Sequence, residues 1–244
     1  MGISVVLLAY KEAENLKILF PRIIKSLKET GQDYEIILID TKETLDETPQ
    51  ICKQFNVSYI NQEEEHYGGA FRTGIKYASK DQMLVLDCDG SHSPEAIVNI
   101  YDKYQEGYDL VIGSRYCKGG KTKDSFGSFV MSKILNTVMR IIIGVKAKDI
   151  STSYRMYNTF QLKSIFLKCE HYDVLQEVIL KLRLNNKKFR IGEVPIVFEK
   201  RIYGESKRQL LKFIRNYLKT LFRLLFMRIK GRDKDVSGNK KIQF

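Results

Sequence analysis

Short apolar runs alternate with segments of helical periodicity through the first half of the 244-residue chain. This alternation is typical of successive βαβ units, which build a mostly parallel sheet with helices on both faces. In such a sheet, ligands bind beyond the carboxyl ends of the strands. The sequence therefore predicts an α/β, doubly wound fold. The expected strands are residues 3–8, 34–39, 57–60, 83–86 and 110–113, and the expected helices are residues 16–27, 48–55, 69–78 and 94–105.

Charged residues follow these strands at the points where their carboxyl ends would meet. They are Asp40, Asp87, Asp89 and Arg115. Residues two apart in an extended backbone project to the same side, so the carboxylates of Asp87 and Asp89 can converge beyond their strand. Paired carboxylates suit Mg²⁺ or Mn²⁺, which bridge substrate phosphates. An Asp-x-Asp sequence also occurs as a solvated turn that caps a helix, so this pair alone leaves both interpretations open.

The turn after the first strand, residues 9–15, reads Ala-Tyr-Lys-Glu-Ala-Glu-Asn. A dinucleotide-binding fold needs Gly-x-Gly-x-x-Gly at this place, so a dehydrogenase is not expected. An aromatic ring and a carboxylate, here Tyr10 and Glu12, fit contacts with a nucleotide base and ribose. Glu12 and Glu14 also fit the ordinary acidic charge of a first helical turn, and both interpretations stay open.

The four cysteines lack Cys-x-x-Cys spacing, and the chain has only three histidines. This pattern argues against a zinc site and against a disulfide framework. Residues 1–4 lead into a strand with no basic and apolar leader before them, so we expect no signal peptide and a reducing, cytoplasmic compartment.

The net charge of +12 is concentrated near the end of the sequence. Residues 200–234 hold twelve basic and two acidic residues, whereas the remainder is nearly neutral. We therefore expect an anionic partner for this region. Nucleic acid is not expected to be that partner, because the charge gathers in one amphipathic helix.

That helix, residues 208–230, places its basic residues on one stripe and its apolar residues opposite. It suits the plane of a membrane interface, although docking on its own domain or on a second subunit remains open. The apolar helix 129–145 is too short and too charged for a membrane span. We expect a main domain at 1–207, the helix at 208–230 and a polar, disordered tail at 231–244. The basic stripe consists of Arg208, Lys212, Arg215, Lys219, Arg223 and Lys230, and the apolar face of Leu210, Phe213, Ile214, Tyr217, Leu221, Leu224 and Leu225.

Several ordered motifs together resemble the family-2 glycosyltransferases, most closely the dolichol-phosphate mannosyltransferase and polyprenyl-phosphate glycosyltransferase branch. They are residues 4–16, Asp40, residues 68–74, residues 87–94, residues 113–116, Arg201 and residues 204–207. The resemblance implies a GT-A fold, a nucleotide-sugar donor linked to GDP or UDP, and Mg²⁺ or Mn²⁺ as cofactor.

The resemblance also assigns residues to roles. The implied metal ligands are Asp87, Asp89 and Ser91. The implied catalytic residues are Asp89, Arg115, Arg201, Lys207 and Asp149. The implied nucleotide-sugar-binding residues are Leu8, Tyr10, Glu12, Asp40, Arg72, Asp87, Cys88, Asp89, Arg115, Arg201 and Lys207.

The sequence departs from the family pattern in places that bear on these roles. Leu8 stands where the family usually has Pro, Ser91 where some members offer a Gln to the metal, and Ser153 where the branch has Gly. Residues 40–46 contain one extra residue, which leaves open whether the donor nucleotide is GDP or UDP. Asp149 is either functional or a strand-capping carboxylate paired with Arg155.

The resemblance implies an inverting transfer of a sugar, with mannose from GDP-mannose as the best expectation, to polyprenyl or dolichyl phosphate at the cytoplasmic membrane face. The loop 198–207 is expected to close as a lid that brings Arg201 and Lys207 over the diphosphate. Two alternatives remain: a transferase that uses a saccharide or other hydroxyl acceptor in cell-envelope glycan synthesis, and a non-enzymatic basic membrane-binding protein.

Overall fold

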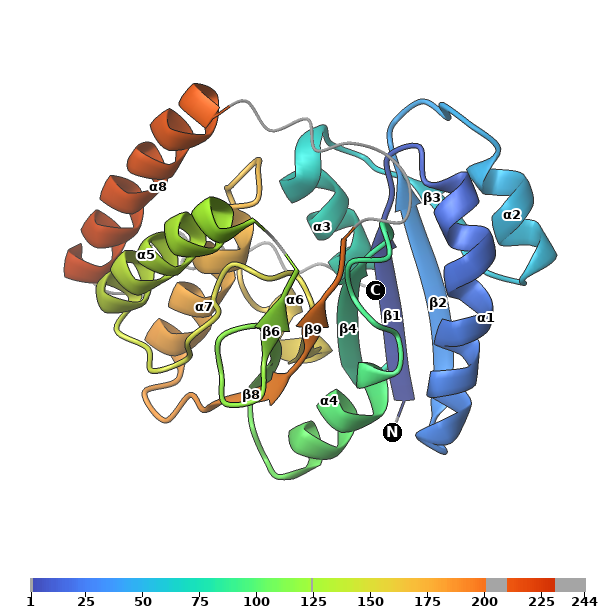
Figure 1. Cartoon of the computed structure of the whole chain (residues 1–244), viewed down its shortest axis with the longest axis horizontal. Helices are drawn as coiled ribbons and strands as arrows, with labels where there is room; N and C mark the ends of the chain where they lie inside the picture. The colour runs from blue at the N-terminus through green and yellow to red at the C-terminus, as the bar shows by residue number, and fades with distance from the viewer. Residues whose placement is uncertain (1, 124, 201–209, 231–244) are drawn as a thin grey trace.

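The computed structural model describes residues 2–123, 125–200 and 210–230 of the chain. In this part, seven strands form one sheet in the order β3-β2-β1-β4-β7-β5-β8 (Figure 1). All neighbouring strands are parallel except β7, which is antiparallel to both β4 and β5. The strands are β1 Gly2–Leu8, β2 Asp33–Asp40, β3 Ser58–Asn61, β4 Gln82–Asp87, β5 Leu110–Ser114, β7 Arg155–Asn158 and β8 Ile191–Pro195.

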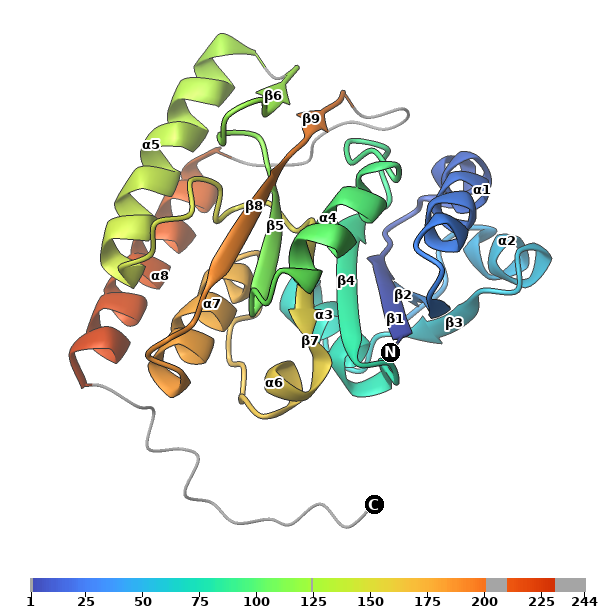
Figure 2. The ribbon, with the colours of Figure 1, turned by 90° about the horizontal axis from the view of Figure 1, so that it is seen from below.

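Helices cover both faces of the sheet (Figures 1 and 2). One buried apolar cluster joins the sheet to α1, α2 and α4, and a second joins its other face to α3, α6 and α7. Two short strands, β6 Lys121–Thr122 and β9 Val197–Phe198, pair separately. The helices are α1 Ala13–Glu29, α2 Thr48–Gln54, α3 His66–Tyr77, α4 Ala96–Gln105, α5 Phe126–Ile143, α6 Thr159–Lys163, α7 Val174–Asn185 and α8 Leu210–Lys230.

The five expected strands and four expected helices of the first half are confirmed, with ends that shift by a few residues. Helix α1 shows why they form. Its Leu16, Phe20, Ile23 and Leu27 recur at helical spacing and are fully buried against the sheet, which is the pattern of an amphipathic helix packed on a core. The mostly parallel α/β architecture is therefore confirmed.

Helix α8 covers residues 210–230 of the expected helix 208–230, but part of its predicted apolar face packs on the protein itself. Leu224 is fully buried, and Leu221 and Met227 pack partly buried against the same core. Figure 2 shows α8 lying beside α5 and α7. Docking on the chain's own domain, which the sequence left open, thus applies to the Leu221 and Leu224 side of the helix.

The remaining expectations about the C-terminal region are limited by what the structure describes. Residues 201–209 and 231–244, and the side chains of residues 210–218, lie outside the description. The lid and the disordered tail therefore remain predictions. No helix among the described residues combines the length and the apolar content needed to cross a bilayer.

Candidate active site

The predicted functional residues gather at one edge of the sheet because their parallel strands end there together. Leu8, the last residue of β1, aligns with Asp87 of β4 and with Ile39 of β2. Asp40 is the last residue of β2, and Arg115 follows the last residue of β5. The sequence-based placement of these side chains at the carboxyl ends of the strands is confirmed.

The carboxylate of Asp87 is oriented by a side chain from the segment before β7. Ser153 donates its hydroxyl hydrogen bond to Asp87 Oδ1 at 2.7 Å. The Asp87 side chain nevertheless remains 31% exposed, so it is accessible to a ligand. Sequence reasoning identified Ser153 only as a departure from glycine, and the structure gives that departure a definite contact.

His92 fixes the backbone at the end of β4. Its Nδ1 accepts a hydrogen bond from the Asp87 backbone N–H at 3.1 Å, and its Nε2 lies 3.3 Å from the hydroxyl of Thr152. The ring stacks on Tyr154, with centroids 4.9 Å apart. Complete burial lowers the pKa of His92, which favours the neutral ring that can accept at Nδ1. In the sequence, His92 belongs to the motif at residues 87–94, but no role was predicted for it.

Asp89 lies in the turn after β4 and is 6% exposed. Its Oδ1 accepts hydrogen bonds from the backbone N–H of Ser91 at 2.9 Å and from the Ser91 hydroxyl at 2.5 Å. Gly90, with φ of 78°, supplies the left-handed residue that this turn requires. Ser91 therefore orients Asp89, while its role as a metal ligand remains a prediction.

Cys88 and Leu8 contribute packing rather than polar groups. The Cys88 side chain belongs to the buried core, and burial raises the pKa of its thiol well above the usual value. Leu8 packs partly buried against the cluster on the other face of the sheet. Any contact of these two residues with a nucleotide sugar would come from their backbone or apolar atoms.

The oxygen ligands available at the end of β4 suit a hard divalent cation. Asp87 and Asp89 supply carboxylates, and Ser91 supplies a hydroxyl, all from one short segment. Oxygen ligands of this kind suit Mg²⁺ and Mn²⁺, which retain positions for water and substrate phosphates. The residues present are thus compatible with the cofactor that the resemblance implies.

Arg115 is held by Asp149 through a two-point contact. Arg115 Nε lies 2.7 Å from Asp149 Oδ2, and Arg115 Nη2 lies 2.9 Å from Oδ1. The Arg115 backbone N–H also donates to Oδ2 at 3.0 Å. Burial alone would raise the pKa of Asp149, but the hydrogen bonds and the charge of Arg115 outweigh burial and lower it. Asp149 therefore fixes the direction of the guanidinium.

The alternative pairing of Asp149 with Arg155 is wrong. Arg155 is fully buried, and its guanidinium donates to the backbone carbonyl groups of Thr152, Ile150 and Leu175. It braces the loop before β7 from inside the core. The correction has a simple cause: Arg115, 34 residues away in sequence, reaches Asp149 from the neighbouring strand β5.

The expected nucleoside end of the site lies beyond β1 and β2. Tyr59 donates its hydroxyl to Asp40 Oδ2 at 2.9 Å, and burial raises the pKa of Asp40 above its usual value. Asn15 donates to the carboxylate of Glu12 at 2.5 Å. The Tyr10 side chain is 49% exposed. Binding of a nucleoside by these residues remains a prediction.

Asp46, at the end of the loop that contains the extra residue, caps two helices. Asp46 Oδ2 accepts a hydrogen bond from the Ala13 backbone N–H at 3.1 Å, and Oδ1 accepts from Thr48 N–H at 3.0 Å. One carboxylate thus caps the N-termini of α1 and α2, where the helix dipoles favour negative charge. This links the loop after β2 to the turn after β1.

Three basic residues complete the predicted donor-binding set: Arg72, Arg201 and Lys207. The Arg72 guanidinium donates to the carbonyl oxygen of Cys169 at 2.8 Å and pairs with the carboxylate of Glu64, which ties α3 to the segment before α7. A contact of Arg72 with the donor remains a prediction. Arg201 and Lys207 lie outside the described residues, so their placement over the diphosphate also remains a prediction.

Replacing Ser153 by Ala should raise the Mn²⁺ concentration for half-maximal activity and lower turnover roughly 10-fold or more. A hydrogen bond to a charged group contributes about 1.5–3 kcal/mol, and this one orients Asp87. Ser164→Ala, at an exposed position after α6, is the control. Metal-dependent activity equal to that of the control would remove the orienting role.

The chain is similar to characterised glycosyltransferases. The model of the family "Glycosyl transferase family 2" matches residues 4–166. A dolichol-phosphate mannosyltransferase of Pyrococcus furiosus is 32% identical over 92% of this chain and 64% of its own length. A polyprenol monophosphomannose synthase of Mycolicibacterium smegmatis is 36% identical over 57% of this chain and 55% of its own length. The chain thus spans less than two thirds of either relative.

Solved structures share the fold at low sequence identity. Mannosyl-3-phosphoglycerate synthase from Rubrobacter xylanophilus has a TM-score of 0.73 at 14% identity, with 100% of this chain and 80% of that chain covered. Glucosyl-3-phosphoglycerate synthase from Mycobacterium tuberculosis, in complex with Mn²⁺, UDP and glucosyl-3-phosphoglycerate, has a TM-score of 0.70 at 17% identity, covering 96% and 81%.

These similarities agree with the mostly parallel α/β architecture. The predicted GT-A fold is confirmed by the sheet and by its structural neighbours. The family model covers well over half of the chain, and it includes most of β1, all of β2 and the Asp87–Asp89 segment. The chain therefore belongs to glycosyltransferase family 2.

Proposed function

We propose that this chain transfers a sugar, with mannose from GDP-mannose as the expected donor, to the phosphate of a polyprenyl or dolichyl phosphate at the cytoplasmic face of a membrane. The observation that carries the proposal is the 32% identity with the dolichol-phosphate mannosyltransferase, which extends over 92% of this chain. The polar residues at the carboxyl edge of the sheet are chemically suited to such a donor.

A phosphate acceptor removes one demand from the protein. A hydroxyl acceptor needs a base to take its proton in the transition state. A phosphate monoester has a second pKa of about 6 and is largely a dianion at neutral pH, so its oxygen is already a nucleophile. The site then needs to align this oxygen with the anomeric carbon and to balance the two anionic groups.

The residues at the carboxyl edge can provide this balance. Asp87 and Asp89 would hold Mg²⁺ or Mn²⁺, which supplies positive charge to the donor diphosphate when bound. Arg115, oriented by its two side-chain hydrogen bonds to the Asp149 carboxylate, would contact the donor diphosphate or the acceptor phosphate. Arg201 and Lys207 would add positive charge from the expected lid.

The donor and acceptor are tested by incubating the protein with radiolabelled GDP-mannose, UDP-glucose or UDP-N-acetylglucosamine, each with polyprenyl phosphate and Mn²⁺. The expected result is label in the lipid extract from GDP-mannose well above that from either UDP sugar. Preference for a UDP sugar would overturn the donor assignment. Transfer to a saccharide supplied in a parallel incubation, with none to polyprenyl phosphate, would favour the hydroxyl-acceptor function instead.

The proposed membrane contact involves the neighbouring helices α5 and α8. Both expose apolar side chains in addition to those that pack on the domain. Lys219, Lys230 and Lys133 are exposed on the same two helices, and such cations favour an anionic lipid surface by about 1 kcal/mol each. The exposed apolar residues are Val130, Met131, Ile134, Val138 and Ile141 of α5, and Phe222, Leu225, Phe226 and Ile229 of α8.

Replacing Phe222 and Phe226 together by Ser should reduce flotation of the protein with anionic liposomes several-fold, because burial of these rings in lipid is lost. Phe160→Ser, on α6 at 80% exposure, is the matched control and should float like the unmodified protein. Flotation should weaken with salt but persist, since the apolar part is not screened. Equal flotation of the double variant and the control would exclude this surface of α8 as the anchor.

A further inference from the structure

Two copies of the tripeptide Glu-His-Tyr, residues 65–67 and 170–172, face each other in the fold. The rings of His66 and His171 lie with centroids 4.6 Å apart. The rings of Tyr67 and Tyr172 stack with centroids 4.1 Å apart. One copy begins α3 and the other precedes α7, so segments distant in sequence bring two imidazoles together beside a carboxylate.

From this arrangement we propose that His66, Glu170 and His171 form a binding site for a transition-metal ion, Zn²⁺ by its ligand chemistry, separate from the hard-cation residues at the end of β4. One ligand atom from each of these side chains lies within 4.8 Å of the other two. Among the described residues, this is the only group of three or more His, Cys, Asp or Glu side chains that meets this condition.

The geometry is close to what a metal requires. Zinc bonds to nitrogen and carboxylate oxygen are about 2.0–2.2 Å long, which puts the ligand atoms of a tetrahedral site about 3.3 Å apart. Rotation of three side chains about their χ angles can close the remaining gap, because His66 and Glu170 are exposed and His171 is half-buried. The same exposure gives an ion a path into the site.

The backbone around the cluster is held firmly. The Gly68 N–H donates to the Glu170 carbonyl oxygen at 2.7 Å. A Cβ atom at Gly68 would lie only 2.0 Å from the Cys169 carbonyl oxygen, so the close approach of the two segments depends on glycine. His66 itself has φ of 66°, a strained conformation that is uncommon for a residue other than glycine. Together these contacts fix the positions from which both histidines reach the cluster.

The ligand types select the class of metal. Imidazole nitrogen suits Zn²⁺, Co²⁺, Ni²⁺ and Cu²⁺, whereas Mg²⁺ and Ca²⁺ prefer oxygen donors alone. Three protein ligands leave a fourth position for water or another ligand. The lack of Cys-x-x-Cys spacing and the small number of histidines argued against zinc, but the fold brings together residues that no short motif connects. A bound ion would link α3 to the segment before α7.

The test uses the full chain carrying Asp89→Asn, which weakens the hard-cation site, and Cys117→Ser, which removes the one cysteine that is not fully buried. Zn²⁺ is titrated by calorimetry, and thermal unfolding is followed with and without Zn²⁺. We expect one equivalent to bind, with a rise in Tm of roughly 5–10 °C at saturation. Mg²⁺ at the same concentration should produce no such rise.

Loss of a ligand then separates this site from adventitious binding. His171→Ala and His66→Asn, the latter chosen because Asn tolerates positive φ, should each weaken Zn²⁺ binding by roughly 100-fold or more. Glu65→Gln, which changes an adjacent carboxylate outside the cluster, should bind as before. Absence of one-equivalent binding, or equal affinity in the His171→Ala protein, would overturn the proposal.

Discussion

Replacing Asp89 by Asn should lower metal-dependent sugar transfer by about 10²–10³-fold while leaving the fold intact. The substitution preserves the shape of a side chain that accepts hydrogen bonds from Ser91, but it removes the negative charge needed to hold a divalent cation. Loss of that cation removes several kcal/mol of charge stabilisation, and about 1.4 kcal/mol corresponds to tenfold in rate. The measurement is radiolabelled transfer over a range of Mn²⁺ and Mg²⁺ concentrations.

Asp102→Asn, at an exposed position on α4, is the matched control and should retain full activity. Removal of metal with EDTA should reduce the unmodified protein to the level of the Asp89→Asn variant. Full activity of the unmodified protein in EDTA, or an Asp89→Asn protein as active as the control, would contradict the metal assignment.

Replacing Asp149 by Asn should lower the free energy of unfolding by about 3–5 kcal/mol and also lower transfer activity. Asp149 is fully buried, and the Arg115 side chain is 9% exposed. Removing one partner of such a pair leaves a charge without compensation in a region of low dielectric constant. Chemical denaturation gives the loss of stability, and transfer assays below the unfolding temperature give the loss of activity.

A second substitution separates stability from activity at this pair. Adding Arg115→Met to Asp149→Asn removes the uncompensated guanidinium, so stability should recover in part. Activity should not recover, because the proposed phosphate contact is gone. Recovery of both would show that Arg115 is only a structural partner of Asp149.

The same pair predicts a pH dependence. The pKa of Asp149 is lowered in the folded protein, so the unfolded chain binds its proton first as the pH falls. The stabilisation is complete above about pH 4, the usual value for Asp, and is lost as the pH falls towards the folded-state pKa. The Asp149→Asn protein should lack this part of the acid dependence of unfolding.

The first half of the fold and the location of the site follow from local patterns. Strands β1 to β5 are short apolar runs, and parallel strands end at one edge, so Asp40, Asp87 and Arg115 were placed correctly. Strand β7 was not foreseen. It inserts antiparallel between β4 and β5, and such pairing between distant segments leaves little trace in local periodicity.

The contacts that orient the side chains of the site could not be predicted from the sequence. Ser153 reaches Asp87 from 66 residues away in sequence, and His92 contacts it across the turn after β4. The alternative that paired Asp149 with Arg155 was wrong, because Arg155 instead donates to backbone carbonyl groups inside the core. The apolar periodicity of α8 was correct, yet periodicity cannot distinguish a face that meets lipid from one that packs on α5 and α7.

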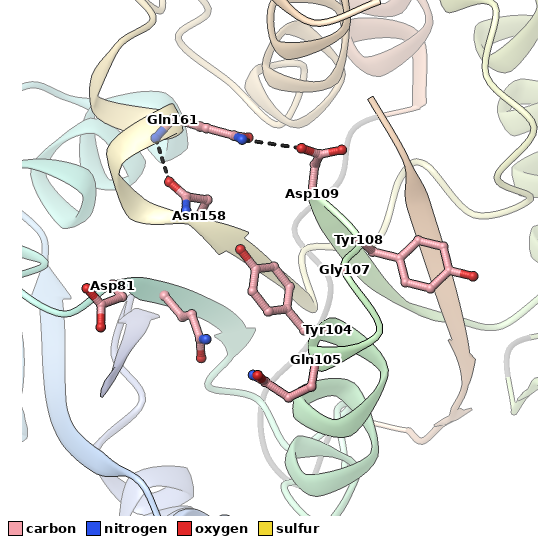
Figure 3. A pocket seen from close by; sticks show the side chains of 9 residues that line it. Asp81, Tyr104, Gln105, Gly107, Tyr108, Asp109, Asn158 and Gln161 are labelled. Atoms are coloured by element: carbon pink, nitrogen blue, oxygen red, sulfur yellow. Dashed lines mark hydrogen bonds between the residues drawn. The ribbon is translucent and has the colours of Figure 1, made fainter. Parts of the chain in front are cut away.

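A hollow at the opposite edge of the sheet does not belong to the site. It is lined by residues that include Gln82, the first residue of β4, and Asn158, the last residue of the antiparallel β7. Figure 3 shows the hydrogen bonds that Gln161 donates there to the side chains of Asn158 and Asp109. Asp87 lies at the opposite end of β4, so sugar transfer is not assigned to this hollow.

In the proposed reaction, the acceptor atom is a phosphate oxygen of a lipid. The decisive comparison is between polyprenyl phosphate and the phosphate-free polyprenol of the same chain length, at equal concentration with labelled GDP-mannose and Mn²⁺. The phosphate should accept label at least ~100-fold faster, because it needs no base and carries the charge that Arg115 would bind. Equal transfer to the free alcohol, or transfer to neither lipid, would contradict the claim.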